Sequence, residues 1–193
     1  MRTETTVWDP FVRLGHWLLA AAFVAAYLTG EEWQGIHHYA GYTVLGVVVF
    51  RLLWGLVGTR PARFATFLTP FSRVKEHLRA VGRLEAPPYP GHNPAGGWAV
   101  VAMLTLLLLA TLSGLATLGA EGAGPLAGVP WLYSLPLVGA VGEEAWEEVH
   151  EAMVNATLLM VLVHLAGVVV ESIAAGENLA RSMVTGRKHL GGH

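Results

Sequence analysis

Long apolar stretches alternate with short polar connections along the chain. Four of these stretches are long enough to cross a bilayer, for which a helix needs about 20 residues. They cover approximately residues 12–28, 37–57, 98–118 and 146–174. The pattern predicts an all-α integral membrane protein, a four-helix bundle built from a single domain over residues 1–193.

The connection between the second and third stretches contains a segment with a different period. Within residues 71–84, apolar side chains recur every three or four positions, opposite the basic ones: Phe71, Val74, Leu78 and Val81. This spacing predicts a short amphipathic helix on the inner membrane surface. We expect His77, in the same segment, to be exposed and without a role.

Composition agrees with a membrane protein and limits the chemistry. Charged residues make up 13% of the chain, whereas soluble domains carry about 25%. There is no cysteine, which excludes disulfides, cysteine-ligated iron–sulfur clusters and covalent attachment of c-type haem. The first apolar run follows an acidic and polar lead, so we expect no cleavable signal peptide. Nine histidines remain as ligands for a cofactor.

The distribution of charge predicts the orientation. All 12 lysines and arginines belong to the N-terminal lead, the second connection, the C-terminal tail or the adjoining membrane ends. The first and third connections contain acids, among them Glu31, Glu32, Glu143 and Glu144, and no base. By the positive-inside rule, both termini lie in the cytoplasm and the chain is a multi-pass protein of the bacterial inner membrane.

Histidines recur at two depths within the apolar stretches. His150 and His164 are 14 residues apart, which is about 21 Å along a helix and about 40° in azimuth, so both face one side. The predicted topology places His16 at the depth of His164. It places His37 or His38 at the depth of His150. The result is two pairs of histidines, one in each leaflet.

Two imidazoles from different helices at one depth are the ligands of a bis-histidine haem. Ionisable side chains are costly inside a membrane, so such residues are functional candidates. A zinc site would require three or four ligands at one depth. The pairs therefore predict two haems b, the inner one held by His16 and His164 and the outer one by His150 with His37 or His38.

The choice between His37 and His38 depends on helix phase. His37 shares its face with Gly41 and Arg51, whereas His38 shares its face with Tyr42. A glycine one turn from the ligand lets a flat macrocycle approach the backbone. Arg51 on the same face, near the inner leaflet, can meet a haem propionate. We therefore assign His37, with His38 as its substitute.

Motifs along nearly the whole chain indicate a family. They are VWDPFVR at residues 7–13, HW at 16–17, HHYAGY at 37–42, FRLLWG at 50–55, ARF at 62–64, GHNPAGG at 91–97, EVHE at 148–151, HxxG at 164–167, ENL at 177–179 and MVTGRK at 183–188. With them the sequence resembles the prokaryotic cytochrome b561 group, in particular the b-type cytochrome subunits of nickel–iron hydrogenases.

The resemblance implies four helices, two haems b, and electron exchange between a membrane quinone pool and a partner. The ligand pattern of the family maps onto His16, His37, His150 and His164, because the ligand histidine opens the HxxAGY motif. The second histidine of this motif, His38, departs from the family pattern.

Three further residues have two readings each. Asn93 is a good N-cap for the third span. Alternatively, this helix N-terminus receives a haem propionate or a quinone carbonyl, with His92 as a proton shuttle. Arg13, one turn before His16, either pairs with an inner-haem propionate or serves only to orient the chain.

The function expected from these features is electron transport across the inner membrane between a quinone pool and a periplasmic redox partner, such as a c-type cytochrome or a hydrogenase. The sequence leaves open whether the chain is itself an enzyme and whether it forms a homodimer, and we expect no nucleic-acid partner. One alternative is a superoxide:quinone oxidoreductase, which would need a basic funnel near the outer haem. The other is a non-redox metal transporter that uses the histidines.

Overall fold

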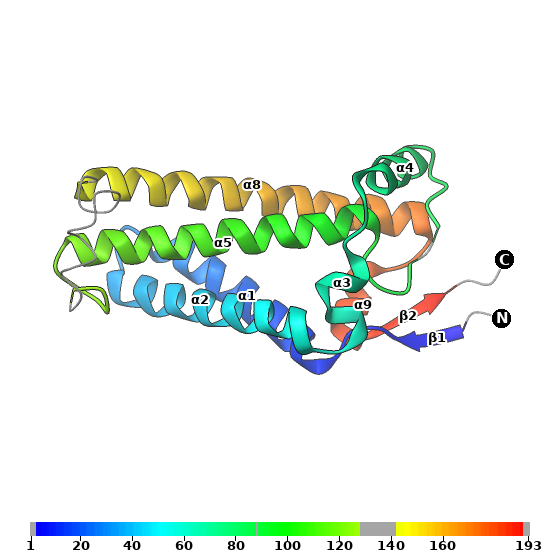
Figure 1. Ribbon diagram of the computed structural model, residues 1–193, viewed down its shortest axis with the longest axis horizontal. Coiled ribbons are helices and arrows are strands. Elements are labelled where there is room, and N and C mark those ends of the chain that lie inside the picture. Colours follow the sequence, from blue (N-terminus) through cyan, green and yellow to red (C-terminus); the bar gives the residue numbers. More distant parts are fainter. Residues whose placement is uncertain (1–2, 88, 128–141, 191–193) are drawn as a thin grey trace.

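The four apolar stretches form long helices that run side by side (Figure 1). The computed structural model describes residues 3–87, 89–127 and 142–190. The long helices are α1 (Pro10–Thr29), α2 (Gln34–Val57), α5 (Pro94–Ala120) and α8 (Glu143–Ala175). Each is long and apolar enough to cross a membrane. The prediction of four long apolar helices is confirmed, and each helix extends a few residues beyond the predicted stretch at one or both ends.

Local sequence explains where these helices begin and end. The side chain of Asp9 caps α1 by accepting a 2.9 Å hydrogen bond from the backbone N–H of Val12. Asn93 caps α5 in the same way, with its Oδ1 2.6 Å from the backbone nitrogen of Gly96, as the N-cap reading of this residue predicts. Helix α8 ends at Gly176, whose φ of 64° is a conformation that glycine adopts without strain.

The helices associate as two pairs. Helix α1 packs along α2 and α5 packs along α8, while α2 and α5 join the pairs. The main apolar core lies between α1, α2 and α5, and consists of Ala22, Val44, Val48, Leu104 and Leu107. Helix α8 adds no buried residue to this core. Its one completely buried side chain is Thr157, which lies midway between His150 and His164 in sequence.

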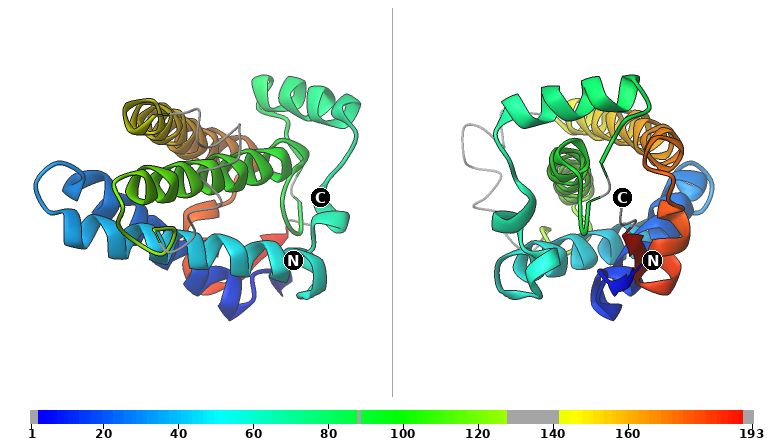
Figure 2. Two further views of the ribbon diagram at one scale, coloured as in Figure 1. Left: turned by 60° about the vertical axis from the view of Figure 1, so that its left-hand side comes forward. Right: turned by 90° about the vertical axis from the view of Figure 1, so that its right-hand side faces the viewer.

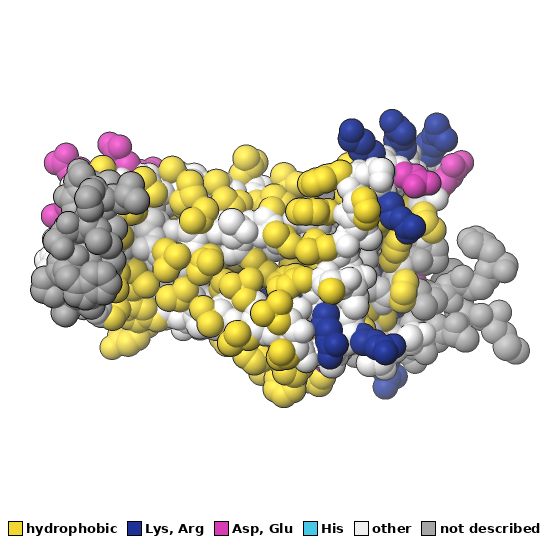
Figure 3. All heavy atoms as spheres, in the orientation of Figure 1, with side chains coloured by type: hydrophobic (Ala, Val, Ile, Leu, Met, Phe, Trp, Pro, Cys, Tyr) yellow, Lys and Arg dark blue, Asp and Glu magenta, His cyan; other side chains and the backbone are white. Residues whose placement is uncertain are grey.

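Outward-facing side chains along the long helices are largely apolar (Figure 3). On α8 they include Leu159, Leu162, Val163 and Val169. Such a surface would be unfavourable in water and is expected where lipid surrounds the protein. In the view of Figure 3 the Lys and Arg side chains lie at one end of this apolar belt, whereas acidic side chains lie at both ends.

Both termini lie at the basic end, which we name the inner end; the opposite end is the outer end. Strand β1 (Thr3–Thr6) pairs antiparallel with β2 (Arg187–Leu190), and Thr3 lies opposite Leu190. The short helix α9 (Leu179–Thr185) leads into β2. The all-α prediction missed this two-stranded sheet, because its strands are four residues long and come from opposite ends of the chain.

The connection between α2 and α5 folds over the inner end. It contains the 3-10 helix η1 (Arg60–Ala62), α3 (Phe64–Phe67) and α4 (Phe71–Gly82). Helix α4 crosses the end of the long helices (Figure 2). Its presence confirms the predicted amphipathic helix, but the prediction for His77 is wrong. This side chain is 3% exposed, and its Nε2 lies 3.1 Å from Oε2 of Glu171 on α8.

Candidate functional site

Four histidines meet as two pairs at the two ends of the long helices. At the inner end, the ring centroids of His16 on α1 and His164 on α8 are 6.4 Å apart. At the outer end, those of His37 on α2 and His150 on α8 are 6.0 Å apart. Two imidazoles that hold one metal ion, each with a nitrogen about 2 Å from it, have ring centres about 6 Å apart. Both pairs therefore have the spacing that a single iron between them requires.

Backbone carbonyls fix the orientation of the outer pair. Nδ1 of His150 lies 2.8 Å from the carbonyl oxygen of Ala110 on α5. Nδ1 of His37 lies 2.9 Å from the carbonyl oxygen of Ala26 on α1. Because a carbonyl can only accept, Nδ1 carries the proton in both rings, and Nε2 keeps the lone pair that a metal needs. At the inner end, Nδ1 of His16 is buried and has no hydrogen-bond partner among the described residues.

Glycines leave room around the histidines. A Cβ at Gly114 on α5 would lie 2.9 Å from Cε1 of His150, so only glycine lets this ring rest against α5. Gly41 and Gly167 lie about one turn from the α2 and α8 histidines of the outer and inner pairs. A Cβ at either position would meet no atom within 4 Å among the described residues. This open space beside the histidines suits the approach of a flat macrocycle.

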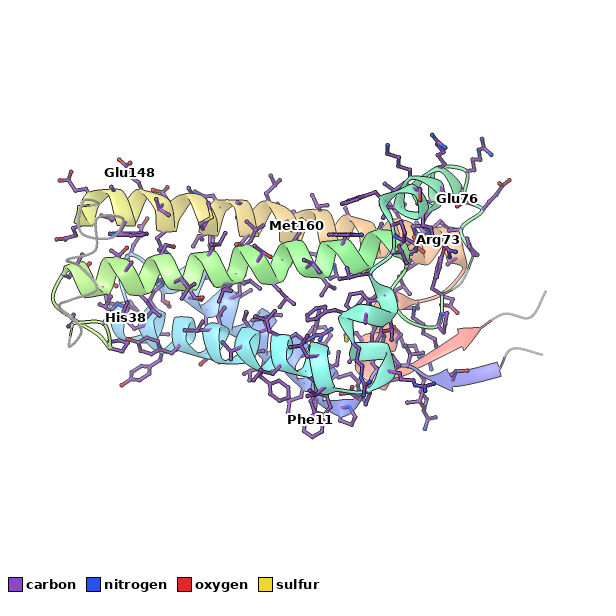
Figure 4. All side chains as sticks on the ribbon, in the orientation of Figure 1. Phe11, His38, Arg73, Glu76, Glu148 and Met160 are labelled. Carbon is purple, nitrogen blue, oxygen red and sulfur yellow. The ribbon has the colours of Figure 1, made fainter. Side chains whose placement is uncertain are left out.

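Of the two adjacent histidines on α2, His37 is the one whose ring meets His150. The ring of His38 lies 6.0 Å from that of His37, at the outer end of α2 (Figure 4). The helix phase that favoured His37 in the sequence therefore agrees with the observed geometry of the pair.

Two arginines near the inner pair have buried nitrogens without partners. Arg51 lies over the ring of Phe64, with Cζ 5.2 Å from the ring centroid. Its Nη1 is buried and has no acceptor in the described part of the chain. Arg13 donates a hydrogen bond to the carbonyl oxygen of Val184, while its Nε is buried and unpartnered. Buried donors without acceptors are unfavourable. Haem propionates would supply acceptors for such donors.

His92 lies in an aromatic cage just before α5. Its ring centroid is 4.7 Å from that of Trp8 and 4.4 Å from that of Phe67. Burial, together with the nearby positive charges of Arg51 and Lys188, lowers the pKa of His92 to about 3. The ring is therefore neutral near pH 7 and does not store a proton there, which disfavours the expected shuttle role. Its Nδ1, buried and unpartnered within the described chain, can still form a hydrogen bond.

The C-terminal strand closes this end of the molecule. Nζ of Lys188 on β2 donates to the carbonyl oxygens of Tyr89 and Gly91, at 3.1 and 2.9 Å. Burial lowers the pKa of this ammonium group, whereas the negative charges of Glu177 and Glu171 raise it. The loop that carries His92 is thereby held from both ends of the chain, by β2 and by Trp8.

Comparison with known proteins identifies the family. The profile of prokaryotic cytochrome b561 matches residues 7–186. The chain belongs to the prokaryotic cytochrome b561 family. A cytochrome of this family is a haem b protein of electron transport, which agrees with the two pairs of histidines. It also argues against the alternative of a non-redox metal transporter.

Curated relatives of this b561-family cytochrome cover almost its whole length. A protein of Rhodobacter capsulatus is 26% identical over 97% of this chain and 82% of its own length. A protein of Rhizobium leguminosarum bv. viciae is 28% identical over 97% of this chain and 90% of its own. Both are named probable Ni/Fe-hydrogenase B-type cytochrome subunit. No solved structure matches the chain.

Several parts of the site have no signature in the sequence. The acceptors of the outer histidines are the backbone oxygens of Ala26 and Ala110, and any residue type supplies such an oxygen. Gly114 and Gly167 did carry a signal, since a glycine inside an apolar span indicates close packing or an approaching group. Asn93 has its Oδ1 occupied by the cap, which leaves only its amide NH2 for a ligand.

Proposed function

We propose that this chain is a dihaem cytochrome b that carries electrons across the bacterial inner membrane between a quinone pool and a periplasmic redox partner. The proposal depends on the two histidine pairs. The ring centroids are 6.4 Å apart in the inner pair and 6.0 Å apart in the outer pair. His16 and His164 hold the inner haem. His37 and His150 hold the outer one, and His38 holds none.

The residues around each pair have separate tasks. A haem with two histidine ligands supplies one-electron transfer without an open coordination position. The carbonyl acceptors of His37 and His150 keep each Nε2 directed at the metal position and raise its basicity. Arg13 and Arg51 offer unpartnered N–H groups to the propionates of the inner haem. Helix α8 carries one ligand of each pair, about 21 Å apart along its axis, and thereby fixes the two levels relative to each other.

Charge at the two ends supports the orientation and the partner. The outer end of α8 carries exposed carboxylates: Glu143, Glu144, Glu147, Glu148 and Glu151. The bases lie at the inner end (Figure 3), which the positive-inside rule assigns to the cytoplasm. The relatives are named as hydrogenase cytochrome subunits, so we infer a hydrogenase as the periplasmic partner. The first and third connections contain no Lys or Arg, which disfavours a superoxide:quinone oxidoreductase.

Haem content tests the proposal directly. The protein purified from cells should give a sharp b-type alpha band in a reduced-minus-oxidised spectrum and two haems per chain by pyridine haemochrome assay. Reconstituted in vesicles with quinone, it should carry electrons between the quinone and a donor or acceptor on the side opposite its termini. A preparation with a single haem, or with none, would contradict the dihaem assignment.

Replacement of His92 by alanine should separate quinone chemistry from haem binding. Nδ1 of this neutral ring has no partner among the described residues, and we assign it to a hydrogen bond with the quinone carbonyl. We expect two haems and an unchanged spectrum, but quinol oxidation slowed about tenfold, the equivalent of one hydrogen bond of about 1.4 kcal/mol. His38→Ala is the matched control. Turnover at the normal rate in His92→Ala would refute this role.

A further inference from the structure

Helix α4 is held on two sides across the inner end (Figures 1 and 2). The ring of Phe71 stacks on that of Trp98 in the second turn of α5, with centroids 4.6 Å apart. On another face of the helix, Nε2 of His77 lies 3.1 Å from Oε2 of Glu171, and both residues are buried. An ion pair or hydrogen bond at this depth fixes the rotation of α4 about its axis. The direction in which its remaining side chains point is therefore set.

The side of α4 away from His77 carries a line of bases. Lys75, Arg79 and Arg83 follow one another at four-residue intervals, and all three are exposed. At this spacing they share one helix face over a length of about 12 Å. We name these three residues the basic stripe. The single acid within α4 is Glu76, so the helix and its C-cap carry a clear excess of positive charge.

Large apolar side chains lie along one side of the basic stripe. Phe71 is 63% exposed and Leu78 is 55% exposed, although Phe71 touches Trp98. Because Trp98 belongs to a membrane-spanning helix, the side of α4 that carries Phe71 is turned toward the apolar belt. Exposed apolar side chains on one side of a basic line are the pattern of a helix that lies in the membrane interface. Figure 3 shows the basic side chains directly beside the end of the apolar belt.

We propose that the basic stripe binds the headgroups of anionic phospholipids in the inner leaflet. Phe71 and Leu78 lie at the level of the acyl chains, and Lys75, Arg79 and Arg83 donate hydrogen bonds to phosphate oxygens. Charge complementarity supports this occupant, since each base near an anionic leaflet strengthens binding about fivefold. The neighbouring apolar side chains favour a lipid over a soluble anion, because only the lipid offers them acyl chains.

The test compares two variants with the same loss of charge at the same end. Lys75→Gln/Arg79→Gln removes two bases from the stripe, and Arg60→Gln/Arg181→Gln removes two exposed bases that lie off it. The haem-loaded protein in neutral detergent is titrated with phosphatidylglycerol and, separately, with phosphatidylcholine, and bound lipid is counted by native mass spectrometry. We expect the stripe variant to bind phosphatidylglycerol about 25-fold more weakly, with much less change in the control variant.

Three other outcomes would overturn the proposal. Equal losses in both variants would mean that the net charge of the inner end, and not the stripe, attracts the lipid. Unchanged phosphatidylglycerol binding in the stripe variant would remove the stripe as a site. Competition by inorganic phosphate as effective as that by phosphatidylglycerol would indicate a site for a soluble anion. The haem content of each variant, measured on the same sample, reports whether the fold is retained. This readout does not depend on the lipid result.

Discussion

Replacing His37 by alanine should halve the haem content of the protein, whereas the same change at its neighbour His38 should leave two haems per chain. His37 has its ring centroid 6.0 Å from that of His150 and its Nδ1 2.9 Å from the carbonyl oxygen of Ala26. The hydrogen bond leaves Nε2 free for iron. If His37 and His150 hold the outer haem as proposed, alanine removes one of its two ligands, and a b-type haem has no covalent attachment to hold it otherwise.

The measurement is a pyridine haemochrome assay together with the reduced-minus-oxidised spectrum. In His37→Ala, about half of the alpha band should be lost, and the remainder belongs to the inner haem. His38→Ala is a close control, because it removes the same side chain at the next position of the same helix. Loss of a haem in His38→Ala with full content in His37→Ala would reverse the assignment of the ligand on α2.

Replacing His164 by alanine should remove the inner haem and stop electron exchange with quinone at that end. The outer pair lies about 21 Å away along α8 and has its own hydrogen bonds to α1 and α5. The outer haem should therefore remain and should still be reduced by a donor on the outer side. Quinone reduction in vesicles should fall to background, because the electron path ends at the outer haem.

Two further variants keep this result interpretable if His164→Ala folds poorly. His164→Met retains a ligand, so we expect two haems, with the reduction potential of the inner one raised. Val163→Ala changes the adjacent residue, which is 54% exposed on the lipid-facing surface, and should leave content and rate unchanged. Full haem content in His164→Ala, or normal quinone reduction by that variant, would exclude His164 as the inner ligand.

The sequence predicts the helices well because a membrane restricts the alternatives. An apolar run of about 20 residues satisfies its backbone hydrogen bonds in a bilayer only as a helix. The pairing of the histidines follows from the same regularity. Since His150 and His164 must share a face, the only open question was which residues lie opposite them. The structure brings His16 and His37 to those positions, while iron ligation itself stays a prediction.

Contacts between distant, irregular segments could not be predicted. Nothing in the periodicity around His77 indicates Glu171, which lies 94 residues further along the chain. The residue is buried because the phase of α4 turns it toward α8, and this depends on how the connection folds. The same holds for the pairing of β1 with β2, whose strands are too short for an alternating pattern to be recognised.

The pairing of β1 with β2 has a consequence for biosynthesis. The backbone N–H groups of Val7 and Trp8 donate to the carbonyl oxygen of Gly186, and Lys188 holds the loop before α5. None of these bonds can form until the ribosome has made residues 186–188. The four spans can therefore enter the membrane one after another during translation. The aromatic cage around His92 takes its final shape only after residues 186–188 have left the ribosome, when β2 meets β1.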